Sequence, residues 1–364
     1  MSHRPEPTRA TPPRPPPHAA SRHWLLGFGL CVLLMLPALW WSWLTPAPYG
    51  DLTRIAYLSE TEFGWHEPQP RIDAGLVRQA PLSQADVLVV GDSFSAALLW
   101  QSVLTGRGWR VTTVTWSVVG PLCADLEHWL RTQGFKGTSV VLQRVERSVP
   151  ELVRDSEGCS RMRPKGSIKS VPQIHAPGSH AAPLTHAPGF AVNWRAPLES
   201  GPVTAWHTWR AQHGPASFVI HETERVRVQD VPQGCSRFSH RLCRRGLFLA
   251  DDLDMPAVID AQVAALPALL PAPSPAGAGL RFVWAVVPNK TTLYLQDQRA
   301  ARLSDAMRAA VVHTGLGVDL FGALRVQRDR QRDLYFPNDT HFSPAGYLFM
   351  GGLIADALGP PPPR

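Results

Sequence analysis

An uncharged apolar run near the N-terminus constrains this chain more than any other feature. Residues 24–44 read WLLGFGLCVLLMLPALWWSWL and contain no acidic or basic side chain. As a helix rising ~1.5 Å per residue, the run is long enough to cross the ~30 Å hydrocarbon core of a bilayer. Its ends carry tryptophans typical of lipid–water interfaces, namely Trp24, Trp40, Trp41 and Trp43. We therefore expect one transmembrane helix over residues 24–44.

The residues before this run predict its orientation. The arm over residues 1–23 carries four arginines and one glutamate, and basic flanks stay on the cytoplasmic side of a membrane. The N-terminus is therefore expected in the cytoplasm, and everything after residue 45 outside it. A cleaved signal peptide is the alternative. The long proline-rich lead, the length of the apolar run and the lack of a clear small-x-small cleavage site argue against it.

The basic balance of the chain does not indicate nucleic-acid binding. Of the net charge of +7, the N-terminal arm contributes +3 and residues 161–169 contribute +4, so the rest of the chain is neutral. A nucleic-acid groove needs basic side chains gathered on a folded surface. At 44% hydrophobic and 18% charged residues, the chain is also too apolar to be disordered throughout. We expect a neutral globular domain outside the cytoplasm.

The cysteines fit an oxidising compartment. Cys31 lies within the apolar run, which leaves Cys123, Cys159, Cys235 and Cys243. An even number predicts two disulfides, with three possible connectivities, and the short separation favours a bond between Cys235 and Cys243. The chain has no Cys-x-x-Cys and no histidines at zinc spacing, so we expect neither a metal site nor a cofactor.

Apolar β-branched runs alternate with helical segments after residue 80. This alternation is typical of an α/β fold with a parallel sheet. The expected strands cover residues 86–91, 110–116, 139–143, 218–228, 281–287 and 318–320. The expected helices cover residues 94–105, 256–270, 299–313 and 344–358, the last with Ser343 as N-cap and Pro344 in its first turn.

These elements divide the chain into parts. Residues 45–80 are interpreted as a linker, residues 81–358 as one domain and residues 359–364 as a proline-rich tail. The domain is interrupted at about residues 160–190 by a stretch that is interpreted as a flexible surface insertion. A metal or pH-sensing role for its three histidines, His175, His180 and His186, is less favoured because intervening Pro and Gly deny them a fixed geometry.

Ser93 is the first candidate for chemistry. It follows the buried run DVLVVG and opens a helical segment, where backbone N–H groups favour negative charge. A serine in this place can attack an acyl carbonyl while nearby N–H donors hold the oxyanion. The alternative is an ordinary strand-to-helix turn with a capping residue.

A second candidate lies near the C-terminus, in PNDTHFSPAGY. Asp339 and His341 are two residues apart, so an extended loop places both side chains on one side of the backbone. The carboxylate can hold the imidazole tautomer while the other ring nitrogen takes a proton from serine. A capped loop before the last helix is the alternative. In an α/β sheet both candidates can reach the same carboxyl edge, which predicts a triad of Ser93, Asp339 and His341.

Four segments together resemble the SGNH (GDSL-type) hydrolase fold. More specifically, they resemble the SGNH-like alginate O-acetyltransferase family of periplasmic exopolysaccharide-modifying proteins. The segments are GDSFS (91–95), SVVLQRVERSV (139–149), VVPNKTTLY (286–294) and DLYFPNDTHFSPAGY (333–347). The resemblance covers about residues 85–150 and 280–358. It implies a three-layer αβα domain in the periplasm, held to the inner membrane by the N-terminal helix.

The resemblance also implies roles for individual residues. The family's serine and Asp-x-His element match Ser93, Asp339 and His341. Its Glu-Arg pair matches Glu146 and Arg147, and its Pro-x-Lys-x-x-x-Tyr segment includes Lys290 and Tyr294. Arg147, Lys290 and Tyr294 are therefore candidate substrate contacts, although a structural ion pair is as good an interpretation for the two basic residues.

Two departures from the family pattern bear on mechanism. The Asp-x-His element usually precedes the serine in this family, whereas here it follows, as in ordinary SGNH enzymes. SGNH hydrolases also supply an oxyanion-hole asparagine, but none of Asn193, Asn289 and Asn338 lies in the expected place. The amides of Ser93 and Phe94, with Gly120, are then the expected oxyanion donors.

The expected function is a membrane-anchored O-acetyltransferase that modifies hydroxyls of an exopolysaccharide through an acyl-serine intermediate. A membrane-bound O-acyltransferase is the implied acyl supplier, since acetyl-CoA is cytoplasmic. One alternative is an esterase or deacetylase with the same triad, and another is a non-catalytic glycan-binding or scaffold protein. Four tryptophans, Trp100, Trp109, Trp116 and Trp129, are interpreted as packing residues, with glycan stacking as the alternative.

Overall fold

The centre of the molecule is a parallel four-stranded sheet in a computed structural model that describes residues 17–163, 166, 168, 187–220, 226–252, 259–270 and 279–363. The strand order is β2-β1-β3-β7. The strands are β1 (Val87–Gly91), β2 (Val111–Thr115), β3 (Ser139–Val145) and β7 (Arg281–Val287). All three pairings are parallel, so the carboxyl ends of the strands share one edge. The predicted α/β class with a parallel sheet is confirmed.

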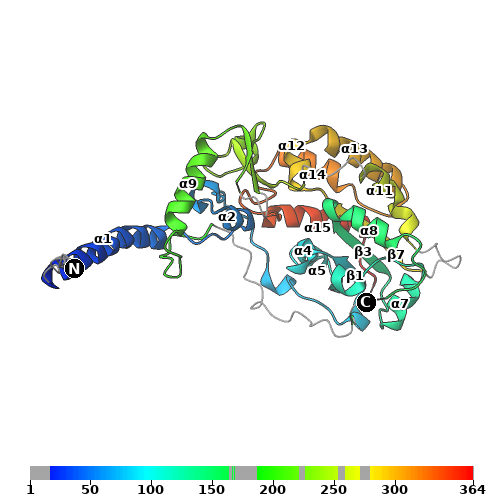
Figure 1. The fold of residues 1–364 in the computed structure, drawn as a ribbon. Helices are drawn as coiled ribbons and strands as arrows, with labels where there is room; N and C mark the ends of the chain where they lie inside the picture. The colour runs from blue at the N-terminus through cyan, green and yellow to red at the C-terminus, as the bar shows by residue number, and fades with distance from the viewer. Residues whose placement is uncertain are drawn as a thin grey trace, which may run out of the picture.

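Helices cover both faces of this sheet because its strands are apolar on both sides. In β1, Leu88 and Val90 pack into one core, while Val87 and Val89 pack into the other. The first core is covered mainly by α7 (Leu126–Thr132), α8 (Val149–Ser156), α11 (Ile259–Ala265) and α13 (Asp297–Met307). The second is covered mainly by α5 (Gln101–Gly106), α12 (Lys290–Leu295), α14 (Leu320–Arg328) and α15 (Pro344–Leu358). Figure 1 shows both layers.

A smaller antiparallel sheet lies between the main sheet and the N-terminal helix. Its strands are β4 (Ser217–Val219), β5 (Val226–Asp230) and β6 (Arg245–Leu249), in that order. Its apolar face packs with α2 (Asp51–Ala56), α3 (Glu60–Phe63) and α9 (Ser200–His213) in a third core. The short helix α10 (Gly234–Arg237) connects β5 to β6. Residues 51–63, within the stretch 45–80 expected to be a linker and entry segment, therefore belong to a folded layer.

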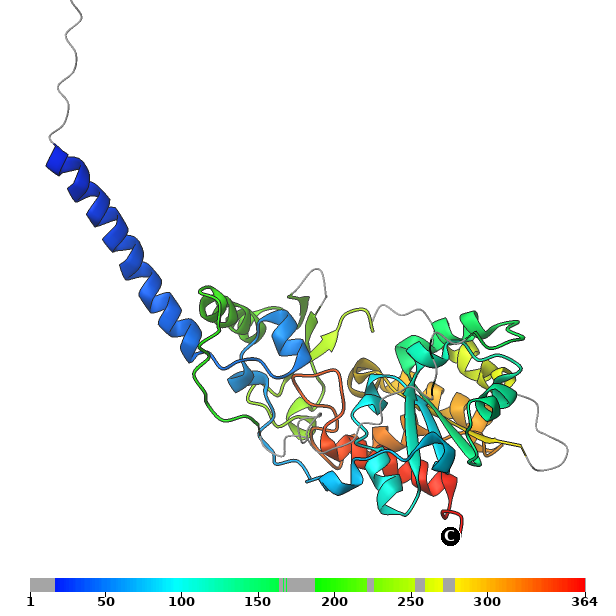
Figure 2. The ribbon, with the colours of Figure 1, turned by 90° about the horizontal axis from the view of Figure 1, so that it is seen from below.

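The N-terminal helix α1 (Pro17–Leu44) extends away from the rest of the molecule (Figures 1 and 2). Its segment Ser21–Leu44 contains an 18-residue stretch with a mean hydropathy of 1.9 and is long and apolar enough to cross a membrane. Only its last turn is enclosed by the domain, where Ser42 has no exposed surface. The expectation of one apolar N-terminal helix is thus met.

Several expected elements differ from the structure. The strand expected over 218–228 is two antiparallel strands, β4 and β5. The helix expected over 94–105 divides into α4 (Ser93–Ala96) and α5, because Leu98 adopts a left-handed conformation with φ of 59°. In place of the strand expected over 318–320, Asp319 accepts the Gly322 N–H and caps α14. Directly before this segment, Gly317 forms an isolated parallel β-bridge with Trp284 of β7.

Two other expectations concern the loops and the tryptophans. Trp100, Trp109, Trp116 and Trp129 are all buried, which confirms the packing interpretation. His175, His180 and His186 lie outside the described residues, as does most of the stretch 160–190. The short helix α6 (Trp116–Val119), which follows β2, was not expected.

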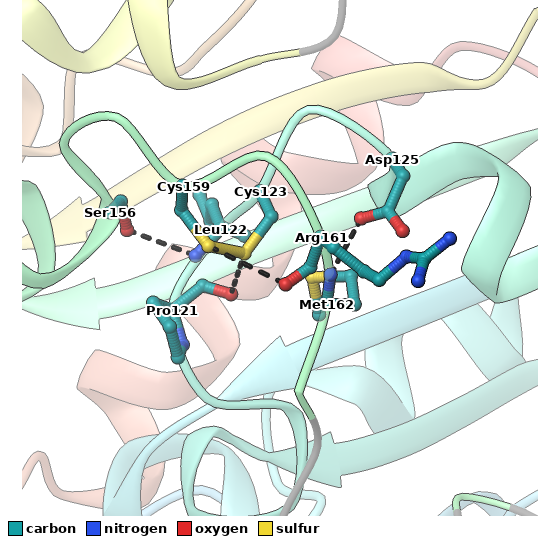
Figure 3. The surroundings of a disulfide bond; sticks show 8 residues. All are labelled: Pro121, Leu122, Cys123, Asp125, Ser156, Cys159, Arg161 and Met162. Carbon is teal, nitrogen blue, oxygen red and sulfur yellow. Dashed lines mark hydrogen bonds between the residues drawn. A yellow bond between two sulfur atoms is a disulfide. The ribbon is translucent and has the colours of Figure 1, made fainter.

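Two disulfides are present, and both join cysteines of the predicted set. Cys235 pairs with Cys243, as the spacing favoured, and Cys123 pairs with Cys159. Figure 3 shows the second bond, which ties the loop after α6 to the end of α8. Beside it, the Leu122 N–H donates to Ser156 Oγ at 2.9 Å. Disulfides of this kind are typical of proteins that fold in an oxidising compartment.

Removing the Cys123–Cys159 bond is expected to destabilise the protein. Its cysteines are 36 residues apart, and opening a loop of this size raises the entropy of the unfolded chain. The Cys123→Ser/Cys159→Ser variant should lose about 2–4 kcal/mol of unfolding free energy, measured by urea denaturation in detergent. Cys31→Ser is the control, because Cys31 is an exposed free cysteine in α1. Equal denaturation midpoints for the two variants would contradict the prediction.

Candidate active site

Ser93 is placed by the turn that joins β1 to α4. Asp92 is the N-cap of α4, with its Oδ1 accepting the Phe94 N–H at 3.0 Å. Its Oδ2 accepts the N–H of Val145 at 2.6 Å, which ties the ends of β1 and β3 together. Ser93 itself is exposed at the first position of the helix. The turn is therefore capped by Asp92 and also presents Ser93 at the carboxyl edge of the sheet.

The loop between α14 and α15 brings a histidine and a carboxylate to Ser93. His341 Nε2 lies 2.9 Å from Ser93 Oγ. His341 Nδ1 lies 2.9 Å from Asp339 Oδ1, which also accepts the backbone N–H of His341 at 2.9 Å. With the proton on Nδ1, the imidazole donates to Asp339 and accepts from Ser93. The structure thus brings together the three residues of the predicted triad in one hydrogen-bonded series.

Aromatic packing fixes the ring of His341, and nearby charges change its pKa. Its ring packs on Phe94, with the ring centroids 5.0 Å apart. Burial alone would lower the pKa of His341, but the hydrogen bond and charge of Asp339, together with the charge of Asp51, outweigh it and raise the pKa. Burial alone would raise the pKa of Asp339, but the hydrogen bond and charge of His341, together with the N–H groups of Asp51 and His341, outweigh it and lower the pKa of that carboxyl. Asp339 is therefore ionised whenever His341 works as a base.

Asp51 is a second carboxylate at the site, and the sequence analysis did not find it. Its Oδ1 accepts the Thr340 N–H at 2.8 Å, and its Oδ2 accepts the Thr340 hydroxyl and lies 3.7 Å from His341 Nδ1. In return, the Asp51 N–H donates to Asp339 Oδ2 at 3.1 Å. Burial, followed by the charge of Asp339, raises the pKa of Asp51. An Asp at the start of a short helix gives no sequence signal for such a contact.

Replacing Asp51 by Asn is expected to change the pH dependence of catalysis. The charge of Asp51 raises the pKa of His341, and the imidazole must be neutral to accept a proton. Without that charge the pKa falls, so the acidic limb of the kcat/KM profile moves to lower pH. The rate at the optimum should fall roughly tenfold, the effect of losing one charge-assisted hydrogen bond of about 1.5 kcal/mol.

A matched control for Asp51 lies nearby in sequence. Asp73 accepts the Gly75 N–H at the start of another short helical turn, away from Ser93. The Asp73→Asn variant should leave the pH profile unchanged. An unshifted acidic limb in Asp51→Asn would show that Asp51 only supports the loop.

The loop that carries Asp339 and His341 is fastened from both sides. On one side, Glu60 Oε2 accepts from the side-chain amide of Asn338 at 2.7 Å, while its Oε1 accepts the N–H groups of Tyr49 and Gly50. A Cβ at Gly50 would lie 2.2 Å from Asn338 O, so this close approach requires glycine. On the other side, Lys290 Nζ donates to the carbonyl oxygens of Phe336, Pro337 and Asp339 at 2.8–3.0 Å.

The expected substrate contacts are partly wrong. Lys290 and Tyr294 are 3% and 1% exposed, so neither side chain can meet a substrate. Lys290 instead positions the site loop, and burial lowers its pKa to about 7. Arg147 is partly exposed and pairs with Asp252 at 3.6 Å. It does not line the Ser93 cavity, although its positive charge acts to lower the pKa of His341. Glu146 pairs with Arg299 at 2.8 Å.

The oxyanion donors also differ from expectation. The Phe94 N–H is taken by Asp92, so it is not available. Among the parts of the chain that the structure describes, no acceptor engages the Ser93 N–H, which makes it the available donor of this turn. Gly120, at the end of α6, does not line the cavity around Ser93. Asn338 lies at the wall of this cavity but is fully buried, and its amide donates to Glu60.

Two adjoining cavities surround the site. The smaller, of about 280 Å³, contains Ser93 and His341. The larger, of about 560 Å³, lies toward the end of α1 and is lined by Pro46, Phe190 and Trp194 among others. Tyr49 and Trp65 line both cavities, and their rings pack edge to face at 5.0 Å. The candidate active site therefore adjoins a second recess, whose lining includes Tyr49, Trp65, Phe190 and Trp194.

The ligating atoms of Asp51, Asp339 and His341 lie within 4.8 Å of one another, close enough to hold a metal ion. Their hydrogen bonds with each other and with Thr340 already use these atoms, however. The donor set therefore fits a proton-transfer series better than a metal centre.

Comparison of the chain with protein-family models, with curated proteins and with solved structures finds no match. What the site can do is therefore inferred from its geometry.

Proposed function

We propose that this protein is a serine-dependent O-acyltransferase with an SGNH-like fold. The observation that carries the proposal is the series Ser93–His341–Asp339, with 2.9 Å at both steps. A serine, a neutral imidazole and a buried carboxylate in this order are the parts needed for acyl transfer. The placement of Ser93 at the carboxyl edge of a parallel sheet supports the same reaction.

The proposed reaction has two halves. Ser93 Oγ attacks the acyl carbonyl of a donor while His341 Nε2 takes its proton, and the Ser93 N–H stabilises the oxyanion. The protonated imidazole then gives the proton to the leaving group of the donor, which leaves an acyl-serine. In the second half, an acceptor hydroxyl attacks this ester, His341 takes the hydroxyl proton, and the proton returns to Ser93 Oγ as the product leaves.

A carbohydrate hydroxyl is the acceptor that the surroundings favour. Tyr49 and Trp65 form an aromatic wall beside Ser93, and such walls suit the apolar faces of sugar rings. The larger recess beyond them has room for further units of a chain. Together with the resemblance in sequence, these features favour an exopolysaccharide as acceptor and transfer of an acetyl group.

We further propose that α1 anchors the protein in the inner membrane, with its N-terminus in the cytoplasm and the sheet domain in the periplasm. The apolar length of α1, the basic arm before it and the two disulfides beyond it support this arrangement. Because acetyl-CoA is cytoplasmic, a membrane-bound O-acyltransferase would supply the acyl group.

Two measurements test the function: detection of an acyl group on Ser93, and the division of product between acetylated oligosaccharide and free acetate. The purified full chain is incubated with a chromogenic acetyl ester, with and without uronate-containing oligosaccharides. We expect mass spectrometry to find an acetyl group on the peptide that contains Ser93, and acetylated oligosaccharide as the main product. Release of acetate alone, with no transfer, would make the protein an esterase. Absence of both acyl-serine and product would leave a glycan-binding or scaffold role.

A further inference from the structure

Helix α9 is locked to the last turn of α1. Ser42 Oγ donates to Leu198 O at 2.7 Å and accepts the Gly201 N–H at 3.0 Å. A Cβ at Gly201 would lie 2.7 Å from Ser42 N, so the two helices meet backbone to backbone. Figures 1 and 2 show α9 lying across the end of α1, at the end of the domain from which α1 extends.

The outer face of α9 carries two exposed tryptophans beside Arg210 and His213. Its inner face is buried in the domain through Gly201, Thr204, Thr208 and Ala211. Helical spacing places Trp206 and Trp209 away from that face, where they are 56% and 52% exposed and stack with ring centroids 5.2 Å apart. Trp206 and Trp209 follow within about two helical turns of Gly201, the residue at which α9 meets the last turn of α1.

The segment before α9 adds two more exposed aromatic residues. Phe190 and Trp194 are 66% and 68% exposed. Trp194 packs on Trp43 of α1 with ring centroids 5.1 Å apart, and the Asn193 N–H donates to Trp43 O at 2.8 Å. We name Phe190, Trp194, Trp206 and Trp209 the aromatic patch. All four lie on α9 or on the segment before it, and both contact the last turn of α1. Large exposed aromatic side chains of this kind are unusual on a soluble surface and mark an interaction site.

We propose that the aromatic patch lies in the lipid–water interface and docks the domain on the bilayer from which α1 emerges. Trp side chains favour this interface because the ring is apolar while its N–H stays hydrated. The patch adjoins Trp40, Trp41 and Trp43, the tryptophans that end α1. The inference rests on the membrane anchoring proposed above but is independent of the acyl-transfer chemistry.

Docking would have a direct consequence for the site. A lone helix lets a tethered domain swing, whereas a second contact fixes its orientation. The recess beside Ser93 is lined by Phe190 and Trp194 of the patch as well as by Tyr49 and Trp65. The docked domain therefore holds this recess at the membrane surface.

Fluorescence quenching in the membrane tests the proposal. The full chain and its Trp206→Phe/Trp209→Phe variant are reconstituted in phosphatidylcholine vesicles, with or without acyl chains brominated near the headgroup. The difference between their emission spectra reports Trp206 and Trp209. We expect this difference emission to lose most of its intensity in brominated vesicles and to resist quenching by aqueous iodide. The proposal would be overturned if brominated lipid left the difference emission unchanged and aqueous iodide quenched it.

Two controls separate docking from anchoring. Val326 is 49% exposed on α14, far from α1, so the emission added by Val326→Trp should respond to iodide and not to bromine. Extraction of the vesicles with alkaline carbonate shows whether α1 holds the chain in the membrane. Release of the protein would overturn both anchoring and docking, whereas retention without quenching overturns docking alone. Neither result depends on whether Ser93 forms an acyl-enzyme.

Discussion

Replacing Ser93 with Ala is expected to lower kcat/KM for acyl transfer by about 10⁴-fold or more. The hydroxyl that receives the acyl group is removed, and His341 Nε2 loses its partner at 2.9 Å. Because Ser93 is exposed and its side chain holds no other element in place, the fold should not change. Initial rates with a chromogenic ester and an oligosaccharide acceptor measure the effect, and the acetyl adduct on the peptide should disappear.

Ser95 provides a matched control in the same motif. Its hydroxyl is buried and donates to Gln143 Oε1 at 2.6 Å, so it supports the turn without reaching the cavity. Ser95 Oγ also accepts the Nε1–H of buried Trp100 at 3.1 Å. The Ser95→Ala variant leaves that donor without an acceptor and should lose about 1–3 kcal/mol of stability while retaining acyl transfer. Normal acetylation by Ser93→Ala would exclude the proposed mechanism, whatever the control shows.

Replacing Asp339 with Asn is expected to lower kcat/KM on the order of 10⁴-fold. Asp339 Oδ1 accepts from His341 Nδ1, which keeps the proton off Nε2. An amide at this position can donate to Nδ1 and so favours the other tautomer, in which Nε2–H can no longer accept the Ser93 proton. Loss of the negative charge also lowers the pKa of His341, so the residual activity should extend to lower pH.

The double variant Ser93→Ala/Asp339→Asn separates catalysis from general damage. If both residues serve one proton transfer, the double variant should be no slower than Ser93→Ala alone. Asp305 is the matched Asp→Asn control, since its carboxylate is 78% exposed on α13 and pairs only loosely with Arg308 at 3.8 Å. Multiplied losses in the double variant would indicate independent effects and contradict a triad.

The sheet and the triad could be predicted because their signals are local. A fully buried parallel strand needs a continuous apolar run, and residues 87–91 supply one that ends two residues before Ser93. The Asp-x-His spacing likewise places Asp339 Oδ1 on both the N–H and the Nδ1 of His341, a contact within two residues. Because such patterns involve only residues close in sequence, they depend little on how the rest of the chain folds.

The other parts of the site depend on contacts between distant segments. Asp51 reaches the site because α2 docks its first N–H groups on Asn338 and Asp339, some 288 residues away. Lys290 has the residue type of a substrate contact, but its position directly after buried β7 encloses it, so it holds backbone carbonyls instead. Neither the contact of Asp51 with the site nor the burial of Lys290 can be predicted from residue spacing or composition.

The separation of the site residues along the chain also affects biosynthesis. Ser93 and His341 are 248 residues apart, and the histidine lies close to the C-terminus. During synthesis α1 and Ser93 leave the ribosome long before Asp339 and His341. On the proposed mechanism, Ser93 has no base to take its proton during that interval. A fragment released before residue 338 would contain α1 and Ser93 but neither Asp339 nor His341, and it should form no acyl-serine.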